Sequence, residues 1–224
     1  MKYSDILAAI VHDVKNSLGV VVNHVDEMLD DPQLPAALRA RAGAMEQEMR
    51  RANGQLVQIL TLYKLDNQRL VPVIDEHNLY DFFEEILIEE APLAKVQGIE
   101  LDMQVDESLN GYFDQDLVRN VLGSTIGNAK RYTHSRILLS AEQQGDYLVL
   151  RIQDDGEGFN DDFLQTYRQE QDTSGRDLSE GRTHLGFFFA DQIARAHENR
   201  GQHGYLRLSN GHDLAGGCFE LWLP

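Results

Sequence analysis

The chain has 224 residues, 42% of them hydrophobic and 25% charged, which is the balance of a soluble globular protein with room for two small domains. Its formal net charge of −17 repels a phosphate backbone and so argues against nucleic-acid binding. The one cysteine, Cys218, excludes an internal disulfide and suits a reducing cytosol.

Neither a membrane span nor a secretory leader is visible in the sequence. No apolar run approaches the roughly 18–20 residues that cross a bilayer. No apolar region of useful length follows the first lysine, Lys2, as a signal peptide would require. We therefore expect a cytoplasmic protein. If the chain is complete, the few residues before His12 leave no space for a sensor module, and a separate protein would supply the input.

The first third of the chain has the period of two long helices. Apolar residues recur there at alternating steps of four and three, which is typical of a heptad seam. Pro32 and Pro35 interrupt the pattern between the two helices. We therefore predict an antiparallel helical hairpin within residues 1–68. The two seams consist of Leu7, Val11, Val14, Leu18, Val21, Val25 and Met28, and of Leu38, Ala42, Met45, Met49, Ala52, Leu56, Ile59 and Tyr63.

A hairpin with one apolar seam on each helix cannot bury both seams well by itself. Two copies that form a four-helix bundle would bury them, and twofold symmetry is the commonest way to build such a bundle. The pattern therefore predicts a homodimer through roughly residues 3–66.

One histidine of the first helix stands out by its neighbours. His12 follows the seam residue Val11 and so lies about 100° around the helix, at the edge of the apolar stripe. Asp13 follows it directly, and Asn16 lies one helical turn further on. We expect His12 to be exposed beside the bundle and to be chemically modified. His24 lacks these neighbours and is interpreted as a polar surface residue.

The second part of the chain, residues 69–224, mixes helical and strand periods. Residues 160–184 are polar and have no clean period. The pattern predicts an α+β fold in which helices cover one face of a sheet. The predicted helices are 79–94, 114–131 and 185–197, and the predicted strands are 99–105, 136–141, 147–153, 205–209 and 218–223.

Three stretches of this part contain residue types that can bind a nucleotide. The first ends a predicted helix with Asn128, Lys130 and Arg131. An amide oxygen such as that of Asn128 can ligate Mg²⁺, and the cations after it can meet phosphates. Read alone, the stretch is equally an ordinary helix C-terminus whose cations complement the helix dipole.

The second stretch follows a predicted strand, where the Asp154 carboxylate can accept a hydrogen bond from an adenine amino group. Gly156 and Gly158 let the backbone approach a ligand closely. Read alone, it is ordinary turn chemistry. The third stretch runs from Gly181 to Phe187 and opens a helix, as a phosphate site can. Read alone, it is an ordinary loop and helix cap.

Together and in this order, the stretches resemble the sensor histidine kinases of two-component systems, and the resemblance covers nearly all of the chain. The matching segments are His12 to Asn16 for the H box of the family, Asn128 to Thr133 for the end of its N box, Asp154, Gly156 and Gly158 for its G1 box, Leu185 to Phe187 for its G2 box, and Gly216 to Pro224 for its closing strand.

The resemblance implies a hairpin at 1–68 that dimerises and carries a phosphohistidine, and an α/β-sandwich ATP-binding domain of the GHKL type at 69–224. It implies that ATP binds with Mg²⁺, with Asp154 reading the adenine and Asn128 holding the metal. Arg131 and Tyr132 would lie near the phosphates. The remaining nucleotide-binding residues that it implies are Gly156, Gly158, Leu185 and Gly186.

The resemblance also implies the chemistry of the first helix. The imidazole of His12 would take the γ-phosphoryl group, with Asp13 orienting the other ring proton. The polar segment 160–184 would form a lid, and Arg176 or Arg182 would reach the γ-phosphate from it. The group would then pass to an aspartate in the receiver domain of a response regulator. Asn16 would position the water that dephosphorylates this regulator, which makes the protein a kinase and a phosphatase.

The sequence departs from the family pattern at several positions. Ser124 replaces the first asparagine of the N box, His184 replaces a glycine of the G2 box, and Ser17 replaces the common proline after the H box. An F box is not apparent, although Phe163 and Tyr167 lie in its region.

These departures leave two rival hypotheses open. The first is a phosphotransfer or scaffolding protein of the same fold whose nucleotide domain does not bind ATP, which His184 and the missing F box favour. Asn128 and the intact stretch from Asp154 to Gly158 favour a working kinase instead. The second, more distant rival is an ATPase of the same superfamily that acts as a serine kinase on a partner.

Overall fold

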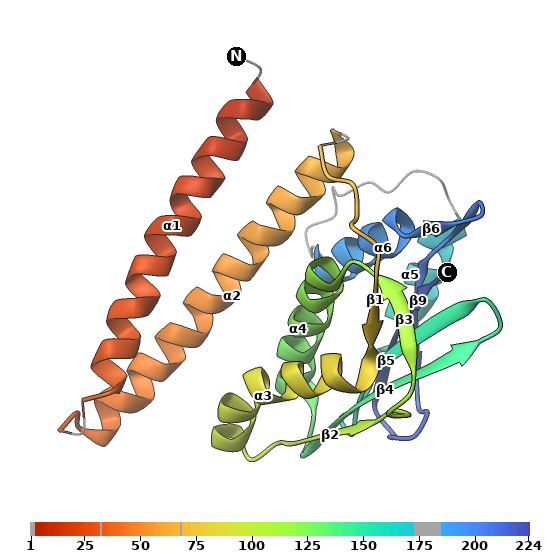
Figure 1. Cartoon of the computed structure of the whole chain (residues 1–224). Coiled ribbons are helices and arrows are strands. Elements are labelled where there is room, and N and C mark those ends of the chain that lie inside the picture. Colours follow the sequence, from red (N-terminus) through yellow and green to blue (C-terminus); the bar gives the residue numbers. More distant parts are fainter. Residues whose placement is uncertain (1–2, 32, 68, 173–184) are drawn as a thin grey trace. The chain divides into compact units, whose positions relative to one another are not determined.

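The computed structural model describes residues 3–31, 33–67, 69–172 and 185–224. The chain divides into two compact units between Val71 and Pro72 (Figure 1). The first unit is helical, and the second combines helices with a mixed sheet. This confirms the predicted α+β class.

The first unit is a hairpin of α1 (Tyr3–Leu29) and α2 (Ala36–Asp66). Arg39 closes the turn between them, because its guanidinium donates to the carbonyl oxygen of Leu29 and, at 2.6 Å, to that of Asp31. An ion pair of 2.8 Å between Arg50 and Asp26 joins the two helices further along. The hairpin was predicted from its apolar period, whereas the arginine contacts at its turn were not.

The second unit contains more elements than the sequence pattern predicts. The unpredicted ones are short strands and one polar helix, which carry little apolar periodicity. In chain order the elements are β1 (Asp75–Asn78), α3 (Leu79–Gln97), β2 (Glu100–Gln104), β3 (Asn110–Phe113), α4 (Gln115–Tyr132), β4 (Arg136–Gln144), β5 (Tyr147–Asp154), α5 (Asp161–Asp172), α6 (Leu185–Ala196), β6 (Glu198–Asn199), β7 (Gln202–His203), β8 (Tyr205–Asn210) and β9 (Gly217–Leu223).

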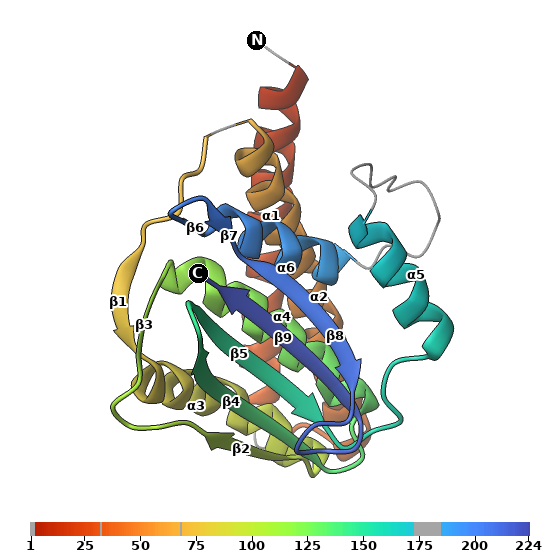
Figure 2. The same cartoon turned by 90° about the vertical axis from the view of Figure 1, so that its right-hand side faces the viewer.

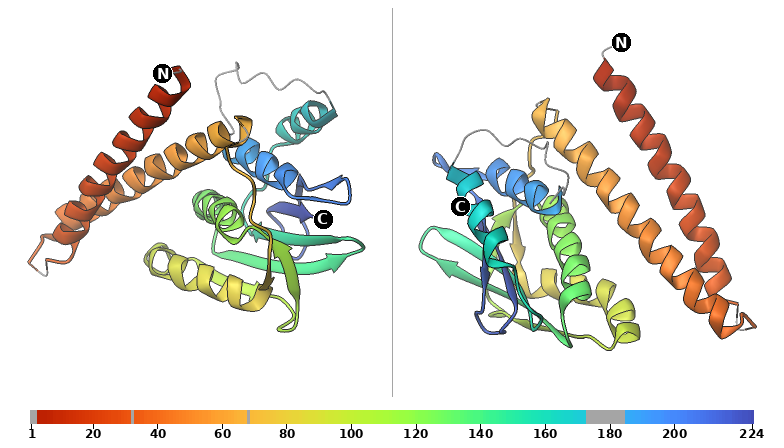
Figure 3. Two further views of the ribbon diagram at one scale, coloured as in Figure 1. Left: turned by 45° about the horizontal axis from the view of Figure 1, so that its top comes forward. Right: turned by 180° about the vertical axis from the view of Figure 1, so that it is seen from behind.

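The main sheet has the strand order β2-β4-β5-β9-β8. The pair β2–β4 is parallel and the other neighbours are antiparallel. Helices α3, α4 and α6 cover one face of this sheet, as predicted (Figure 2). Helices α4 and α6 lie side by side over it (Figure 3). The carboxyl end of β5 therefore lies close to the helical layer that carries the other candidate residues.

Side-chain caps fix where the helices of the second unit begin. The Asn78 side chain accepts from the backbone N–H of Asp81 at 3.0 Å at the start of α3. Asp114 does the same for Leu117 at the start of α4, also at 3.0 Å. At the other end of α3, Gly98 adopts φ +72°, the left-handed conformation that glycine tolerates best.

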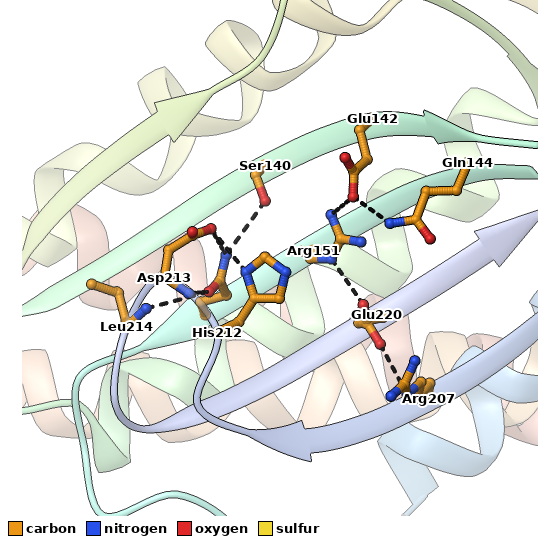
Figure 4. A network of polar contacts seen from close by, with 10 residues as sticks. Ser140, Glu142, Gln144, Arg151, Arg207, His212, Asp213, Leu214 and Glu220 are labelled. Carbon is orange, nitrogen blue, oxygen red and sulfur yellow. Dashed lines mark hydrogen bonds and ion pairs between the residues drawn. The ribbon is translucent and has the colours of Figure 1, made fainter.

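The face of the sheet away from the helices carries a polar layer (Figure 4). The Arg151 guanidinium is almost fully buried there and pairs with Glu220 at 2.8 Å and with Glu142 at 2.6 Å. Gln153 is fully buried and donates to Asp213 at 3.1 Å. Because these groups alternate with apolar residues along the strands, they hold β4, β5 and β9 in register.

Candidate active site

The predicted phosphoacceptor stretch lies within α1. The structure describes His12 through its backbone alone, which is helical. The side chains of Asp13 and Asn16 are exposed. The Ser17 hydroxyl donates to the carbonyl oxygen of Asp13 at 3.0 Å, so this serine adds a hydrogen bond where the family often has a proline. Helix α1 therefore runs unbroken past the predicted site.

The end of α4 separates its two cations. The Lys130 side chain is only 1% exposed and pairs with the Glu90 carboxylate of α3 at 2.6 Å. It also donates to the backbone oxygen of Glu90 at 3.1 Å. Arg131, in contrast, is exposed, as is Tyr132. Of the two cations that the sequence offers for phosphate contacts, Lys130 is thus engaged with Glu90 and ties α4 to α3.

Asp154 ends β5 and is surrounded by glycine backbone. Its Oδ1 atom accepts from the N–H of Gly156 at 2.9 Å and from that of Gly217 at 3.3 Å. Its backbone oxygen accepts from the N–H of Gly216 at 2.9 Å. A Cβ atom on Gly216 would lie 2.4 Å from Asp154 Oδ1, so only glycine fits there. The carboxylate is thereby held in one orientation.

Two glycines bring the predicted stretches together. A Cβ atom on Gly156 would lie 2.1 Å from the carbonyl oxygen of Tyr132, so the turn after β5 passes directly against the end of α4. A Cβ atom on Gly186 would lie 3.5 Å from the Asn128 amide nitrogen, so the start of α6 adjoins the same helix. Asn128, Asp154 and Leu185 therefore border one region, as the order of the motifs predicts.

Gly158 has a structural task in this region. It adopts φ +77°, and the Asn210 amide bonds both the N–H and the carbonyl oxygen of the next residue, Phe159, each at 2.7 Å. The left-handed turn is thus sealed by a side chain from the end of β8. Gly158 accordingly shapes the loop that leads from β5 to α5.

An aromatic cluster, which the sequence did not predict, holds α5 and the start of α6. Phe187 lies at its centre, with ring centroids 5.8 Å from those of Phe159 and Phe163. Tyr167 and Phe219 complete it, each at 6.4 Å from Phe187. The spacing of Phe163 and Tyr167, four residues apart and so on one face of a helix, is a signal that could have indicated it. This cluster supplies aromatic packing in the region of the missing F box.

Asp155 is another feature of the site that the sequence did not single out. Its carboxylate accepts hydrogen bonds from the segment after α4, Thr133 to Arg136. The signal that could have indicated it is the alternation of side chains at the end of a strand. This alternation turns neighbouring aspartates toward different elements. The predicted lid residues Arg176, Arg182 and His184 lie outside the described residues.

The donor set fits a nucleotide that brings its own metal ion. Among the described residues, none of the histidines, cysteines and acids gather in a group of three or more that could hold a metal ion. Mg²⁺ is typically bound through one or two protein oxygens together with substrate phosphates. The Asn128 amide beside Gly186 offers one such oxygen.

None of the helices that the structure describes is long and apolar enough to cross a membrane.

Comparison with known sequences agrees with the arrangement of these motifs. The profile of the family described as "Histidine kinase-, DNA gyrase B-, and HSP90-like ATPase" matches residues 113–224, half of the chain. The sensor protein CopS of Pseudomonas syringae is 25% identical over 158 residues, which cover 70% of this chain and 32% of CopS. The sensor protein kinase PmrB of Pseudomonas aeruginosa is 26% identical over 222 residues, which cover 95% of this chain and 44% of PmrB. The chain thus spans less than half the length of these relatives.

Solved structures share the fold. The Acinetobacter baumannii histidine kinase AdeS superimposes with a TM-score of 0.61 at 19% identity, over 95% of this chain and 96% of that one. Full-length ShkA in complex with AMPPNP gives a TM-score of 0.64, also at 19% identity, over 97% of this chain and 44% of that one. At this identity the likeness establishes a common fold.

Proposed function

Because the chain belongs to the family of histidine kinase-, DNA gyrase B- and HSP90-like ATPases, we propose that it is the core of a two-component sensor histidine kinase. The observation that carries this proposal is the convergence of Asn128, Asp154 and Gly186 in the second unit. The hairpin of α1 and α2, with His12 in its first helix, provides the acceptor part. We assign residues 1–68 to dimerisation and phosphotransfer, and residues 69–224 to catalysis.

The second unit is proposed to hold ATP and Mg²⁺. Asp154 accepts the hydrogen bond of the adenine amino group, since its carboxylate is already oriented by Gly156 and Gly217. Asn128 offers its amide oxygen to the metal ion, and the exposed Arg131 and Tyr132 lie near the phosphates. Bound ATP supplies the phosphoryl group. The other proposed contacts come from Gly158, Leu185 and Gly186.

The hairpin is proposed to receive and pass on that group. His12 is the acceptor, and Asp13 orients the proton on the other ring nitrogen. Asn16, one turn further along α1, positions water for the reverse reaction on a response regulator. A regulator receiver domain is therefore the proposed partner. Since ATP is the phosphoryl donor, we place the protein in the cytoplasm.

Exposed apolar residues on the hairpin support a homodimer. Val22, Val25 and Ala42 are buried within the hairpin itself. A second apolar set is at least 40% exposed and recurs at intervals of seven or fourteen residues along each helix. These residues are Val14, Val21 and Met28 of α1, and Leu38, Met45 and Ile59 of α2. This spacing is what a four-helix bundle of two hairpins requires.

Incubation with labelled ATP and Mg²⁺ tests the proposal. Wild type is expected to incorporate label. The bound label should be stable in alkali and labile in acid, as phosphohistidine is. His12→Ala is expected to incorporate none, and Asn128→Ala to lose about a hundredfold in rate or more, since a metal-positioning group is removed. Label that persists in His12→Ala would rule out His12 as the acceptor. Unlabelled wild type that still takes label from a phosphorylated regulator would indicate the phosphotransfer protein instead.

A further inference from the structure

We propose that Asp155 is a positioning residue for nucleotide binding, which fastens the end of α4 to the end of β5. This inference rests on the proposed function, because it concerns the same site. Asp155 follows the proposed adenine-reading residue Asp154 directly in the chain. It bonds to a different element and contributes to the site through the residues that it holds.

The Asp155 carboxylate accepts five hydrogen bonds from one short segment. Its Oδ1 atom accepts from the Thr133 hydroxyl at 2.5 Å. The same atom accepts from the backbone N–H groups of His134 and Ser135 at 2.9 Å and of Arg136 at 3.0 Å. Its Oδ2 atom accepts from the Ser135 hydroxyl at 2.6 Å. Every donor belongs to residues 133–136, which link α4 to β4, and we call this segment the α4–β4 link.

The geometry of the link calls for an anion at this point. The N–H of Thr133 still donates to Ala129 at 2.9 Å as the last bond of α4. The next three N–H groups have left the helix and converge on one oxygen, which is the arrangement of a backbone nest for an anion. Asp155 fills that nest from within the chain. A second bond, from the N–H of Asp155 to the carbonyl oxygen of Arg136 at 3.2 Å, closes the same contact from the other side.

The carboxylate stays charged in this setting. Burial acts to raise the pKa of Asp155, but the hydrogen bonds from Ser135, Thr133 and Arg136 outweigh it and hold the pKa well below its usual range. A full negative charge is therefore available to the link at neutral pH. Bonds of this charge-assisted kind are roughly twice as strong as neutral ones.

The contact sets the distance between two parts of the site. Asp154 is held by Gly156 and Gly217, whereas Asp155 is held by the α4–β4 link. One peptide unit thus joins the proposed adenine-reading carboxylate to the end of the helix that carries Asn128, Arg131 and Tyr132. Gly156 packs against the Tyr132 carbonyl without space for a Cβ atom. The end of β5 therefore has little freedom to move relative to the end of α4. Asp155 therefore fixes the distance between the proposed adenine contact at Asp154 and the proposed phosphate contacts at the end of α4.

Four variants of the full chain test this role. Asp155→Ala removes all five bonds. Asp155→Asn keeps the Oδ1 acceptor and loses the charge, so it is the conservative rescue. Asp102→Ala is the matched control, since Asp102 is an aspartate that pairs with the Arg136 side chain at 2.6 Å and does not touch the backbone of the link. Ser135→Ala removes one bond only and serves if Asp155→Ala does not fold.

Two quantities are measured: the rate of hydrogen exchange at the amides of His134, Ser135 and Arg136, and the Kd of ATP with Mg²⁺. Both are measured at a temperature at which every compared variant is folded. Asp155→Ala is expected to speed exchange at these amides and to weaken ATP binding, each about tenfold or more, because bonds to a charged acceptor are lost. Asp155→Asn is expected to recover most of both losses, and Asp102→Ala to change neither. Ser135→Ala is expected to fall between wild type and Asp155→Ala.

Folded Asp155→Ala with unchanged exchange would show that the carboxylate does not fasten the link. Faster exchange with unchanged ATP affinity would show that the link does not position the site. Either result overturns the proposal, as does an equal loss in Asp102→Ala. If wild type binds no ATP, the proposed function fails together with the positioning role, and the exchange data then report only whether Asp155 fastens the link.

Discussion

A single added carbon at Gly216 would collide with the Asp154 carboxylate, which we propose reads the adenine. A Cβ atom there would lie 2.4 Å from Asp154 Oδ1, 2.6 Å from the Asp154 carbonyl oxygen and 2.6 Å from the Gly156 nitrogen. These neighbours are backbone atoms or a hydrogen-bonded carboxylate, so displacing them would cost considerable free energy. Gly216 is required by its surroundings, although its own φ lies outside the left-handed region.

We predict that Gly216→Ala lowers stability by about 1–3 kcal/mol, the usual cost of overpacking, and weakens ATP binding about tenfold or more by displacing Asp154. Gly127→Ala is the control, since a Cβ atom there meets nothing within 4 Å. It lies in α4, so alanine should stabilise the helix by about 1 kcal/mol. Urea unfolding and calorimetric titration with ATP check both variants. Equal behaviour of the two would contradict this account of Gly216.

Lys130 shows how a residue can match a motif and still do something else. Its position after Asn128 suggested a phosphate contact, because a cation near a nucleotide site has that chemistry. The side chain instead turns to Glu90, forty residues earlier in the chain. Sequence spacing within α4 cannot reveal a partner on α3, since helical period gives the direction of a side chain without naming what lies there.

At the scale of elements, His197 joins the end of α6 to the start of α4. Its Nδ1 atom donates to the Ile193 carbonyl oxygen at 2.7 Å, and its Nε2 atom accepts from the Asp114 N–H at 3.0 Å. Both nitrogens are thus used by a neutral ring. Burial lowers the pKa of His197, although the bond to Ile193 and the Asp114 carboxylate act to raise it.

Stability should therefore fall on mild acidification. The unfolded chain takes up a proton at His197 near pH 6.5, whereas the folded chain resists it. The contribution of the neutral ring is complete above about pH 6.5 and is lost as the pH falls below that value toward the folded pKa. Urea unfolding between pH 7.5 and 5.5 measures the slope. His197→Gln, which can accept from Asp114 without titrating, should flatten it, and an unchanged slope would exclude His197 as its source.

Elements with a strong period could be predicted from the sequence, and those without one could not. Helices α1, α2 and α4 carry a regular apolar stripe, and β4 and β5 alternate, so their existence follows from local pattern. Strand β1 reads Asp-Glu-His-Asn and pairs with β3 across more than thirty residues. Such pairing is decided by tertiary contacts, which local pattern does not contain.

The candidate site divides in the same way. Asn128, Asp154, Gly156 and Gly186 could be proposed from the sequence because the order of their motifs along the chain is itself a signal. The Asp155 contact and the cluster around Phe187 were not, because each depends on side chains that several elements bring together. Motif order can therefore indicate which chemistry is present, whereas the groups that space and support it emerge from the fold.

At the scale of the whole molecule, the hairpin has a surface that a single copy does not bury. Val14, Val21 and Met28 form one exposed row on α1, and Leu38, Met45 and Ile59 form another on α2. Other members of the predicted seams, such as Val25 and Ala42, face inward. The apolar period thus serves two interfaces, one within the hairpin and one that we assign to a second copy.

We predict that wild type has twice the 25.4 kDa mass of one chain by light scattering, and that Val21→Glu reduces it to one chain. In a symmetric bundle the substitution buries two like charges, which is costly. Asn23→Glu adds the same charge to an exposed position of α1 and should leave the dimer intact. Because Val21 is already exposed in the single hairpin, Val21→Glu should keep its helical circular dichroism. A folded Val21→Glu that stays dimeric would place the interface on another surface of the chain.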